Sequence, residues 1–262
     1  MFTLKNISVK IGTRSLLKDI NLSAESKQIT GLVGKSGSGK STLFRLALGL
    51  LDPADGYEWA GSLLWNGEQL PAKQNPKVQP VFQDPFASFS HLGTMFELLL
   101  EPARIKHQYF LSNQTKQNEW EKIGTFCERL DLSKDLLKKT KQELSGGQLQ
   151  RFAILRALLT KPEYLLLDEP VTALDVLVQK KIAEELKQIN KTENLGMFIV
   201  SHDLGFLSYM CDQIFVLDEG QIVESGEPEK VLAHPKSQLL KSLLAARDHS
   251  FGGVVSSSES SN

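Results

Sequence analysis

Residues 34–42 read Gly34-Lys35-Ser36-Gly37-Ser38-Gly39-Lys40-Ser41-Thr42 and match the pattern G-x-x-x-x-G-K-[ST]. The apolar run just before them, 28–33, predicts a buried strand. After them, apolar residues recur at the helical spacing i, i+3, i+4 and i+7, at Leu43, Leu46, Ala47 and Leu50. A strand, a glycine-rich loop and a helix start therefore coincide. This context favours a phosphate-binding loop over a turn that carries a solvated lysine.

The loop has the residue types that hold the phosphates of a nucleotide. Its glycines let backbone N–H groups turn toward an anion at a helix N-terminus, where unpaired donors and the helix dipole favour negative charge. Lys40 is predicted to reach the β- and γ-phosphates, Ser41 to coordinate Mg²⁺, and Thr42 to add a phosphate contact. The predicted phosphate-binding residues are Gly34, Lys35, Ser36, Gly37, Ser38, Gly39, Lys40, Ser41 and Thr42.

A second predicted strand ends in two carboxylates. The apolar run Tyr164-Leu165-Leu166-Leu167 is followed by Asp168-Glu169-Pro170. In parallel α/β sheets ligands bind beyond the carboxyl ends of the strands, so we expect Asp168 to face the same crevice as Lys40. Asp168 is the expected Mg²⁺ partner, and Glu169 the group that polarises the attacking water. The alternative is that paired acids simply end a strand in solvent, which a neighbouring phosphate loop makes less favoured.

Between these two motifs stands the pentapeptide Leu144-Ser145-Gly146-Gly147-Gln148. In this order the three motifs resemble the signature set of ATP-binding cassette (ABC) ATPases, and the resemblance runs from residue 2 to about residue 244. It implies an α/β fold of the P-loop NTPase class, with a RecA-like core, an antiparallel β subdomain and an inserted helical subdomain. It also implies an enzyme that hydrolyses ATP with Mg²⁺.

The resemblance gives the pentapeptide a role in a dimer. Its serine and glycines are predicted to open a helix, whose N-terminus is suited to an anion. In ABC ATPases this end faces the γ-phosphate bound by the partner subunit, so that two chains sandwich two nucleotides head to tail. The residues expected to act in this way are Ser145, Gly146, Gly147 and Gln148. An N-capped helix without a ligand explains Ser145 alone but not the double glycine.

Four further positions correspond to named positions of the family, three with the usual residue and one, Ile11, with a different one. Gln83 resembles the Q-loop glutamine, which touches Mg²⁺ or the attacking water, and His202 resembles the switch histidine. Asp175, in Thr172-Ala173-Leu174-Asp175, resembles the D-loop aspartate and is also a predicted helix N-cap. Ile11 stands where the family usually has an aromatic residue that stacks on adenine, which predicts weaker packing on the base. Without the family order, Gln83 and His202 would be an ordinary loop amide and a surface histidine.

The chain divides into one domain and a tail. Residues 1–247 are predicted to form the ABC ATPase domain, with its core at 1–83 and 151–247 and a helical arm bearing the signature at 84–150. Residues 248–262 are rich in Ser and Gly and are predicted to be disordered. A basic cluster in the arm is predicted to be a solvated helix face, with lipid headgroup contact as a lesser alternative; it consists of Lys134, Lys138, Lys139 and Lys141.

Composition limits the function classes. The formal net charge of -1 argues against a nucleic-acid-coating surface, so no nucleic-acid partner is expected. No stretch approaches 18 consecutive apolar residues, and residues 1–5 do not resemble a signal peptide. Cys127 and Cys211 lack metal or disulfide spacing, which fits a reducing compartment, and Cys127 is predicted to be a core residue.

Two segments indicate a subgroup. Gln83-Asp84-Pro85-Phe86-Ala87-Ser88-Phe89 resembles the Q-D-P-x-x-S-[LF] run of ATPases that serve peptide and nickel importers, and residues 234–240 resemble the H-P-[YF]-[TS]-x-x-L segment of the same group. The chain departs from the group at Ser90-His91-Leu92-Gly93 and at Lys141-Gln142, where Pro-His is usual. A longer C-terminal extension with cysteines, frequent in peptide importers, is not found here, which shifts the expectation modestly toward nickel or a metal chelate.

The predicted function is that of an ATP-hydrolysing subunit of an importer, peripheral at the cytoplasmic face of the inner membrane. Its expected partners are transmembrane permease subunits, a second ATPase subunit in a homo- or heterodimer and, indirectly, a solute-binding protein. Two alternatives stay open: a soluble ABC ATPase that powers a cytosolic enzyme complex, and a regulatory subunit that binds ATP without turnover.

Overall fold

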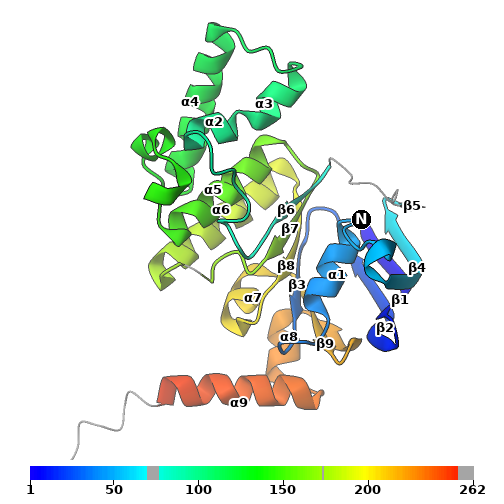
Figure 1. Cartoon of the computed structure of the whole chain (residues 1–262). Helices are drawn as coiled ribbons and strands as arrows, with labels where there is room; N and C mark the ends of the chain where they lie inside the picture. The colour runs from blue at the N-terminus through cyan, green and yellow to red at the C-terminus, as the bar shows by residue number, and fades with distance from the viewer. Residues whose placement is uncertain (70–76, 173, 253–262) are drawn as a thin grey trace, which may run out of the picture. The chain divides into compact units, whose positions relative to one another are not determined.

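The computed structural model describes residues 1–69, 77–172 and 174–252, with the side chains described as far as Ala246 (Figure 1). The chain folds into two compact units. The first contains Met1–Ser23, Thr30–Gln69 and Ser201–Asn262, and the second contains Ala24–Ile29 and Leu70–Val200. Both contain strands and helices, so the predicted α/β class is confirmed.

The first unit contains an antiparallel sheet with the strand order β2-β1-β4-β5. Its strands are β1 (Phe2–Ile11), β2 (Arg14–Ala24), β4 (Tyr57–Trp65) and β5 (Glu68–Gln69). The pairing of β1 with β4 runs from Phe2 opposite Trp65 to Ile11 opposite Tyr57, with one irregularity between Lys5 and Ser8. On β1, Ile7 and Val9 are buried while Lys10 is exposed, which is the period-two alternation of a strand with one core face. This sheet is the antiparallel β subdomain that the resemblance implies.

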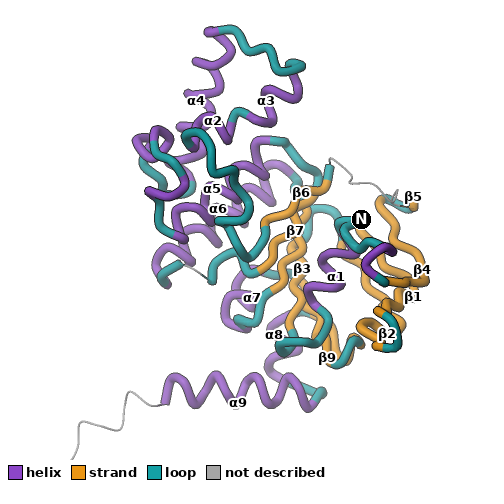
Figure 2. The backbone as a smooth tube through the Cα atoms, in the orientation of Figure 1, coloured by secondary structure: helices purple, strands orange, loops and turns teal. Residues whose placement is uncertain are grey.

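Parallel strands carry the phosphate loop in the same unit. Strand β3 (Ile29–Val33), with all residues buried, pairs parallel to β9 (Gln213–Asp218), and β10 (Gln221–Gly226) pairs antiparallel to β9. Figure 2 shows α1 (Lys40–Ala47) as the next element after β3, with the phosphate loop between them. The remaining helices of the unit are η1 (Pro53–Asp55), α7 (Leu204–Met210), α8 (Pro228–Ala233) and α9 (Gln238–Gly252).

The second unit is built on three parallel strands. Strand β7 (Tyr164–Asp168) lies between β6 (Val78–Val81) and β8 (Gly196–Val200), so that Leu167 is opposite both Val81 and Ile199. The run Tyr164–Leu167 is completely buried, as a strand covered on both faces should be. Two long helices accompany these strands, α5 (Gly146–Leu159) and α6 (Val176–Glu193).

The predicted helical arm lies in this second unit. It comprises α2 (Met95–Leu99), α3 (Glu101–Lys106), α4 (Asn113–Arg129), η2 (Lys134–Lys138) and η3 (Lys141–Glu143). Phe96 and Trp120 meet edge to face at 4.8 Å, which fixes α2 against α4. Cys127 is fully buried, and this burial raises the pKa of its thiol to about 12. The thiol is therefore an unreactive core group, as predicted.

Two boundaries differ from the sequence-based ones. Residues 151–200, expected in the core with the phosphate loop, group with the arm, because α5 runs directly from the arm to β7 and packs against β6. Helix α9 continues to Gly252, so the first five residues of the expected tail, 248–252, are helical, and 253–262 lie outside the described residues. Within the described part of the chain, no helix combines the length and the apolar character needed to cross a bilayer.

Candidate nucleotide site

The loop between β3 and α1 is tightly packed on its own unit. A Cβ added to Gly34 would lie 2.3 Å from the carbonyl oxygen of Leu217 and 2.6 Å from Ser38 Oγ, so only glycine fits. Gly37 and Gly39 have φ values of 79° and 108°, a region that residues with side chains rarely adopt. Gly220 donates from its N–H to the carbonyl oxygen of Ser38 at 3.0 Å and so ties the loop to the end of β9. The loop is therefore a rigid backbone cradle.

The helix that follows this loop begins without a side-chain cap. Gly39 is the N-cap of α1 and makes no side-chain cap hydrogen bond, and the first turn has no acidic residue. By contrast, Ser145, Asp175 and Asp203 cap α5, α6 and α7. Unpaired N–H groups at a helix start, with the positive end of the helix dipole, suit an anion. The cradle and the uncapped helix therefore fit the phosphates of a nucleotide.

Lys40 is held over this loop. Its ammonium donates to the carbonyl oxygens of Gly34 at 2.7 Å and Lys35 at 2.9 Å. Both acceptors belong to the loop, so the positive charge lies at the cradle. Ser41 and Thr42 follow in the first turn of α1, at the positions that the sequence pattern requires.

His202 lies in the same unit as the phosphate loop. Ser201, the residue that follows β8, donates from its N–H to the carbonyl oxygen of Leu32 on β3 at 3.1 Å. Leu32 precedes Gly34, the first residue of the phosphate loop, by two residues. His202 is exposed, and the next residue, Asp203, caps α7 by accepting from Phe206 N–H at 2.9 Å. The structure thus brings His202 and the phosphate loop to one edge of the sheet.

Glu169 occupies an unusual position directly after β7. Its φ of 49° is left-handed, and among the non-glycine residues with positive φ in the described chain it alone is buried, at 8% exposure. Its N–H donates to the carbonyl oxygen of Val200 at 2.9 Å, and its carboxylate accepts from Thr172 Oγ1 at 3.0 Å. A buried carboxylate held in a sparsely populated conformation is typical of a functional site rather than of a strand end in solvent.

Asp168 and Gln83 are at the same edge of the second unit. Asp168 ends β7 half-buried opposite Val200, while Gln83 lies exposed two residues beyond Val81 of β6. Among the described residues there is no cluster of three or more His, Cys, Asp or Glu side chains suited to a metal. A Mg²⁺ ion bound with phosphates requires only one or two protein carboxylates, so a single carboxylate such as that of Asp168 is chemically sufficient on the protein side.

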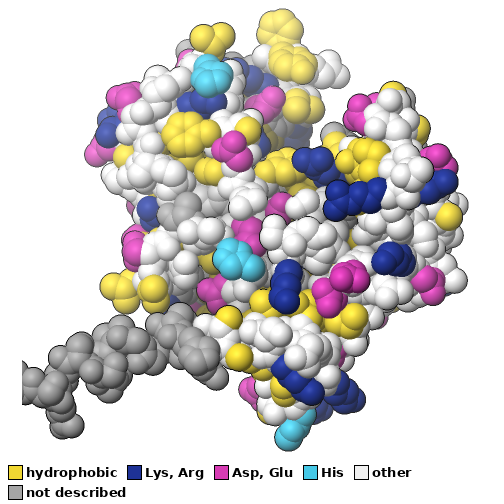
Figure 3. Space-filling model, turned by 60° about the horizontal axis from the view of Figure 1, so that its bottom comes forward, with side chains coloured by type: hydrophobic (Ala, Val, Ile, Leu, Met, Phe, Trp, Pro, Cys, Tyr) yellow, Lys and Arg dark blue, Asp and Glu magenta, His cyan; other side chains and the backbone are white. Residues whose placement is uncertain are grey.

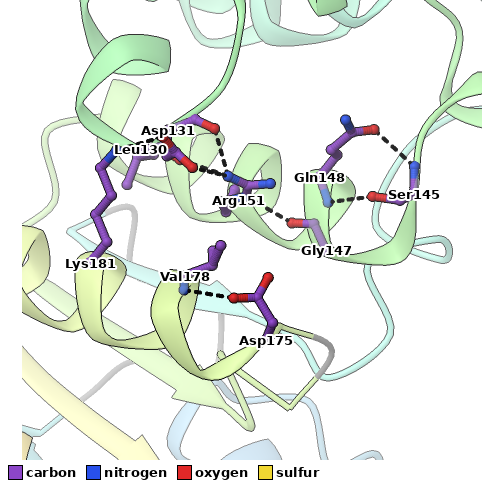
Figure 4. A network of polar contacts seen from close by, with 9 residues as sticks. All are labelled: Leu130, Asp131, Ser145, Gly147, Gln148, Arg151, Asp175, Val178 and Lys181. Atoms are coloured by element: carbon purple, nitrogen blue, oxygen red, sulfur yellow. Dashed lines mark hydrogen bonds and ion pairs between the residues drawn. The ribbon is translucent and has the colours of Figure 1, made fainter.

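The signature residues form the capped start of α5 (Figure 4). Ser145 Oγ accepts from the N–H of Gln148 at 3.2 Å, and Gln148 Oε1 accepts from the N–H of Ser145 at 3.0 Å, which makes a capping box. The N–H groups of Gly146 and Gly147 fall in the first turn, beyond the reach of intrahelical acceptors. A Cβ on Gly146 would meet no atom of the described residues within 4 Å, so their packing does not explain that glycine.

An ion-pair network joins this helix to α6 (Figure 4). Arg151 donates to the carbonyl oxygens of Gly147 at 3.2 Å and Asp131 at 2.6 Å, and Lys181 pairs with the carboxylate of Asp131. The hydrogen bond from Lys181, with the charges of Lys181 and Arg151, holds the pKa of Asp131 below its usual value. Asp175 caps α6 by accepting from Val178 N–H at 3.0 Å, as predicted; Ala173 of the expected D-loop lies outside the described residues.

Lys141 corrects one interpretation of the sequence. The sequence predicts it on a solvated helix face with Lys134, Lys138 and Lys139, which are exposed, but Lys141 is only 3% exposed. Its ammonium donates to the carbonyl oxygens of Phe86 at 2.8 Å and Phe89 at 2.6 Å, in the turn after Gln83. Buried carbonyls paired with the charge explain this burial. In the sequence, only the departure from the usual Pro-His at 141–142 indicated that Lys141 differs from the other lysines of this cluster.

Arg156 of α5 holds the same turn. Its guanidinium stacks on the Phe89 ring at 4.6 Å and donates to the carbonyl oxygen of Ser88, while burial lowers its pKa. Asp84 closes the turn by accepting from the N–H groups of Phe86 and Ala87 at 2.9 and 3.2 Å. Two cations from the signature region therefore fix the backbone next to Gln83.

Comparison with known proteins agrees with this geometry. The family model described as ABC transporter matches residues 17–172. This chain therefore belongs to the ABC transporter family, and within it the chain is an ATP-binding and ATP-hydrolysing subunit. It is 33% identical over 249 residues to a putative peptide import ATP-binding protein of Brucella ovis, covering 92% of this chain and 75% of that one. It is 32% identical to the oligopeptide transport ATP-binding protein OppF of Bacillus subtilis, covering 90% and 77%.

Solved structures show the same fold. The dimeric post-hydrolysis form of the ATP-binding cassette MJ0796, bound to ADP and Pi, superposes with a TM-score of 0.73 at 26% identity, covering 87% of this chain and 99% of that one. CbiO1 of Clostridium perfringens, part of the ABC transporter complex cbiONQ, superposes with a TM-score of 0.73 at 24% identity and covers 96% of both chains. The predicted ABC ATPase fold is confirmed.

Proposed function

We propose that this chain is the ATP-hydrolysing subunit of an importer for peptides. It lies peripherally at the cytoplasmic face of the inner membrane, bound to permease subunits, and works as a dimer with a second ATPase subunit. The observation that carries the proposal is the buried, left-handed Glu169 at the end of β7. A carboxylate in that position orients water for phosphoryl transfer, which a chain that merely stores nucleotide does not need.

Each predicted residue has a role in this reaction. Lys40 and the loop N–H groups bind the β- and γ-phosphates of ATP, and Ser41 and Asp168 are the ligands proposed for Mg²⁺, which neutralises phosphate charge when bound. Glu169 accepts the proton of the attacking water. Gln83 and His202 contact the γ-phosphate side of the site. Ser145 and Gly147 act from the partner subunit. Because the predicted residues are divided between the two units, their assembly into one site is part of the proposal.

Peptide, rather than nickel, is the proposed solute class. The expectation of nickel or a metal chelate finds no support in these relatives, whose names are peptide import and oligopeptide transport proteins. The chain spans about three quarters of the length of those relatives. The solute-binding protein remains an indirect partner that delivers the peptide to the permease.

The test is the substitution Glu169→Gln, which keeps size and hydrogen bonding but removes the base. We expect MgATP binding to persist, phosphate release to fall by at least about a hundredfold, and an ATP-bound dimer to accumulate. Glu229→Gln on exposed helix α8 is the matched control and should behave as the wild type. Wild-type turnover in Glu169→Gln would refute the role of the carboxylate.

Two measurements on the wild-type chain test the alternatives. A wild-type chain that binds ATP without releasing phosphate would be the regulatory subunit. Co-purification with a cytosolic enzyme complex instead of permease subunits would identify the chain as the soluble ABC ATPase of the first alternative. Figure 3 shows acidic and basic side chains interspersed over the face that it draws. The absence of a nucleic-acid partner stays a prediction.

A further inference from the structure

The start of strand β2 is bound to the phosphate loop. The N–H of Lys18 donates to the carbonyl oxygen of Gly220 at 2.8 Å, and the N–H of Gly220 donates to that of Ser38 at 3.0 Å. A Cβ on Gly39 would lie 2.8 Å from Leu17 Cδ2 and 3.0 Å from the carbonyl oxygen of Leu16. The sheet edge that contains residues 16–18 is therefore in direct contact with the loop proposed to hold phosphates.

The turn between β1 and β2 lies one short strand segment from this contact. Arg14 begins β2 directly after the Gly12-Thr13 turn, and the three steps from Arg14 to Leu17 span about 10 Å of strand. That is comparable with the reach of a nucleotide from its phosphates to its base. Ile11, the last residue of β1, adjoins the same turn, but its side chain is not flat.

Strand β4 places an aromatic residue beside Ile11. In the antiparallel register Ile11 is opposite Tyr57, the first residue of β4. Directly paired residues point to the same face of the sheet, with Cβ atoms about 5 Å apart. Both side chains are half-buried, and a Cβ on Gly56 would lie 3.9 Å from Ile11 Cγ1, so the two strands are closely packed here.

We propose that Tyr57 provides the aromatic face for the nucleotide base, in place of the aromatic residue that Ile11 replaces. The inference rests on the proposed ATP site and names one further residue of it. Stacking on an aromatic ring is favourable for any base, because every base has a π-face. The tyrosine therefore increases affinity for nucleotides with little preference for adenine over guanine.

The test uses binding of non-hydrolysable ATP and GTP analogues and of tripolyphosphate to the full-length chain. We expect Tyr57→Leu to weaken both analogues about tenfold, within the range for a base stacked on an aromatic ring. Tripolyphosphate, which has no base, should bind the variant and the wild type equally. Tyr57→Phe keeps the ring and should bind the analogues like the wild type.

Trp59 tests which ring of strand β4 carries the effect. It is on the same face, opposite Val9, is 42% exposed and lines the same pocket as Leu17, but it is not the residue paired with Ile11. Trp59→Leu should leave all three affinities unchanged. A loss of analogue affinity in Trp59→Leu alone would assign the stacking to Trp59 and overturn the role of Tyr57. In the Tyr57→Leu background, Ile11→Tyr should recover the affinity for the analogues by returning a ring to the same face.

The possible results separate this inference from the proposed function. Unchanged analogue affinity in Tyr57→Leu, or an equal loss for tripolyphosphate, would overturn the role of Tyr57 while leaving ATP binding intact. If the double variant with Tyr57→Leu and Ile11→Tyr folds but still binds the analogues weakly, that result would also overturn the role of Tyr57, because a ring at position 11 should replace the ring at position 57. A wild-type chain that binds neither analogues nor tripolyphosphate would instead contradict the proposed nucleotide site itself.

Discussion

Gly34 and Gly146 are both glycines of predicted phosphate-binding motifs, yet the structure gives different reasons for them. At Gly34 a methyl group would collide with the backbone of Leu217 at 2.3 Å, so the chain itself requires glycine. At Gly146 a methyl group would meet nothing within 4 Å in the part of the chain that the structure describes. The first glycine is therefore explained by folding, and the second leaves room for a group from outside the chain.

Gly34→Ala is expected to destabilise the protein. Because the collision is with a backbone carbonyl rather than a flexible side chain, the loop must shift, and we expect the free energy of unfolding to fall by about 2–3 kcal/mol. The shift in the urea midpoint measures this change. Gly146→Ala is the control, with no loss of stability. Equal stability of the two variants would show that the loop absorbs the methyl group.

At the scale of elements, buried Lys141 connects the segment before α5 to the turn that follows Gln83. Removing its ammonium leaves the carbonyls of Phe86 and Phe89 without their donor in a buried site. We expect Lys141→Met to lower the free energy of unfolding by about 1–3 kcal/mol and to reduce turnover, because the turn directly follows Gln83. Urea unfolding and phosphate release check both. Lys139→Met, at an exposed lysine, should change stability by less than about 0.5 kcal/mol.

The ion pairs of Asp131 with Arg151 of α5 and Lys181 of α6 make the stability of the protein depend on pH, and the sign of this dependence follows from the lowered pKa of Asp131. The folded-state pKa of Asp131 is lowered from 3.8, so its ion pairs stabilise the protein above that pH and are lost as pH falls through the lowered value. The side chain is 43% exposed, so the effect is at most about 1 kcal/mol. Asp131→Asn should be slightly less stable at neutral pH and lose less stability as the pH falls below about 4. Parallel stability curves for the variant and the wild type would contradict this.

At the scale of the whole molecule, the proposed dimer makes a prediction that the single chain does not. Gly146→Ala should bind ATP normally as a monomer and be as stable as the wild type or more so, since alanine favours helix by up to about 1 kcal/mol. Its ATP-driven dimer should be lost, and turnover with it, because the methyl group occupies space intended for the partner's phosphate. Analytical ultracentrifugation with and without MgATP measures this. A normal ATP-dependent dimer would exclude this helix start from the interface.

Local sequence was sufficient for the motifs and the elements that carry them. The glycine loop with its flanking strand and helix, the capping box of Ser145 with Gln148, and the cap at Asp175 each depend on residues a few positions apart. Hydrogen bonds and φ preferences of that range are encoded in neighbouring side chains. The ABC ATPase fold was inferred from the resemblance of these motifs to a known family, and the roles of the site residues stay predictions.

Tertiary structure alone decided three features. The burial of Lys141 depends on carbonyls more than fifty residues away, and the register that sets Tyr57 opposite Ile11 joins strands separated by more than forty. The grouping of residues 151–200 with the arm follows from packing of α5 on β6. The sequence shows which side chains are available, but long-range pairing and burial determine which of them meet, because no local preference specifies a contact so distant along the chain.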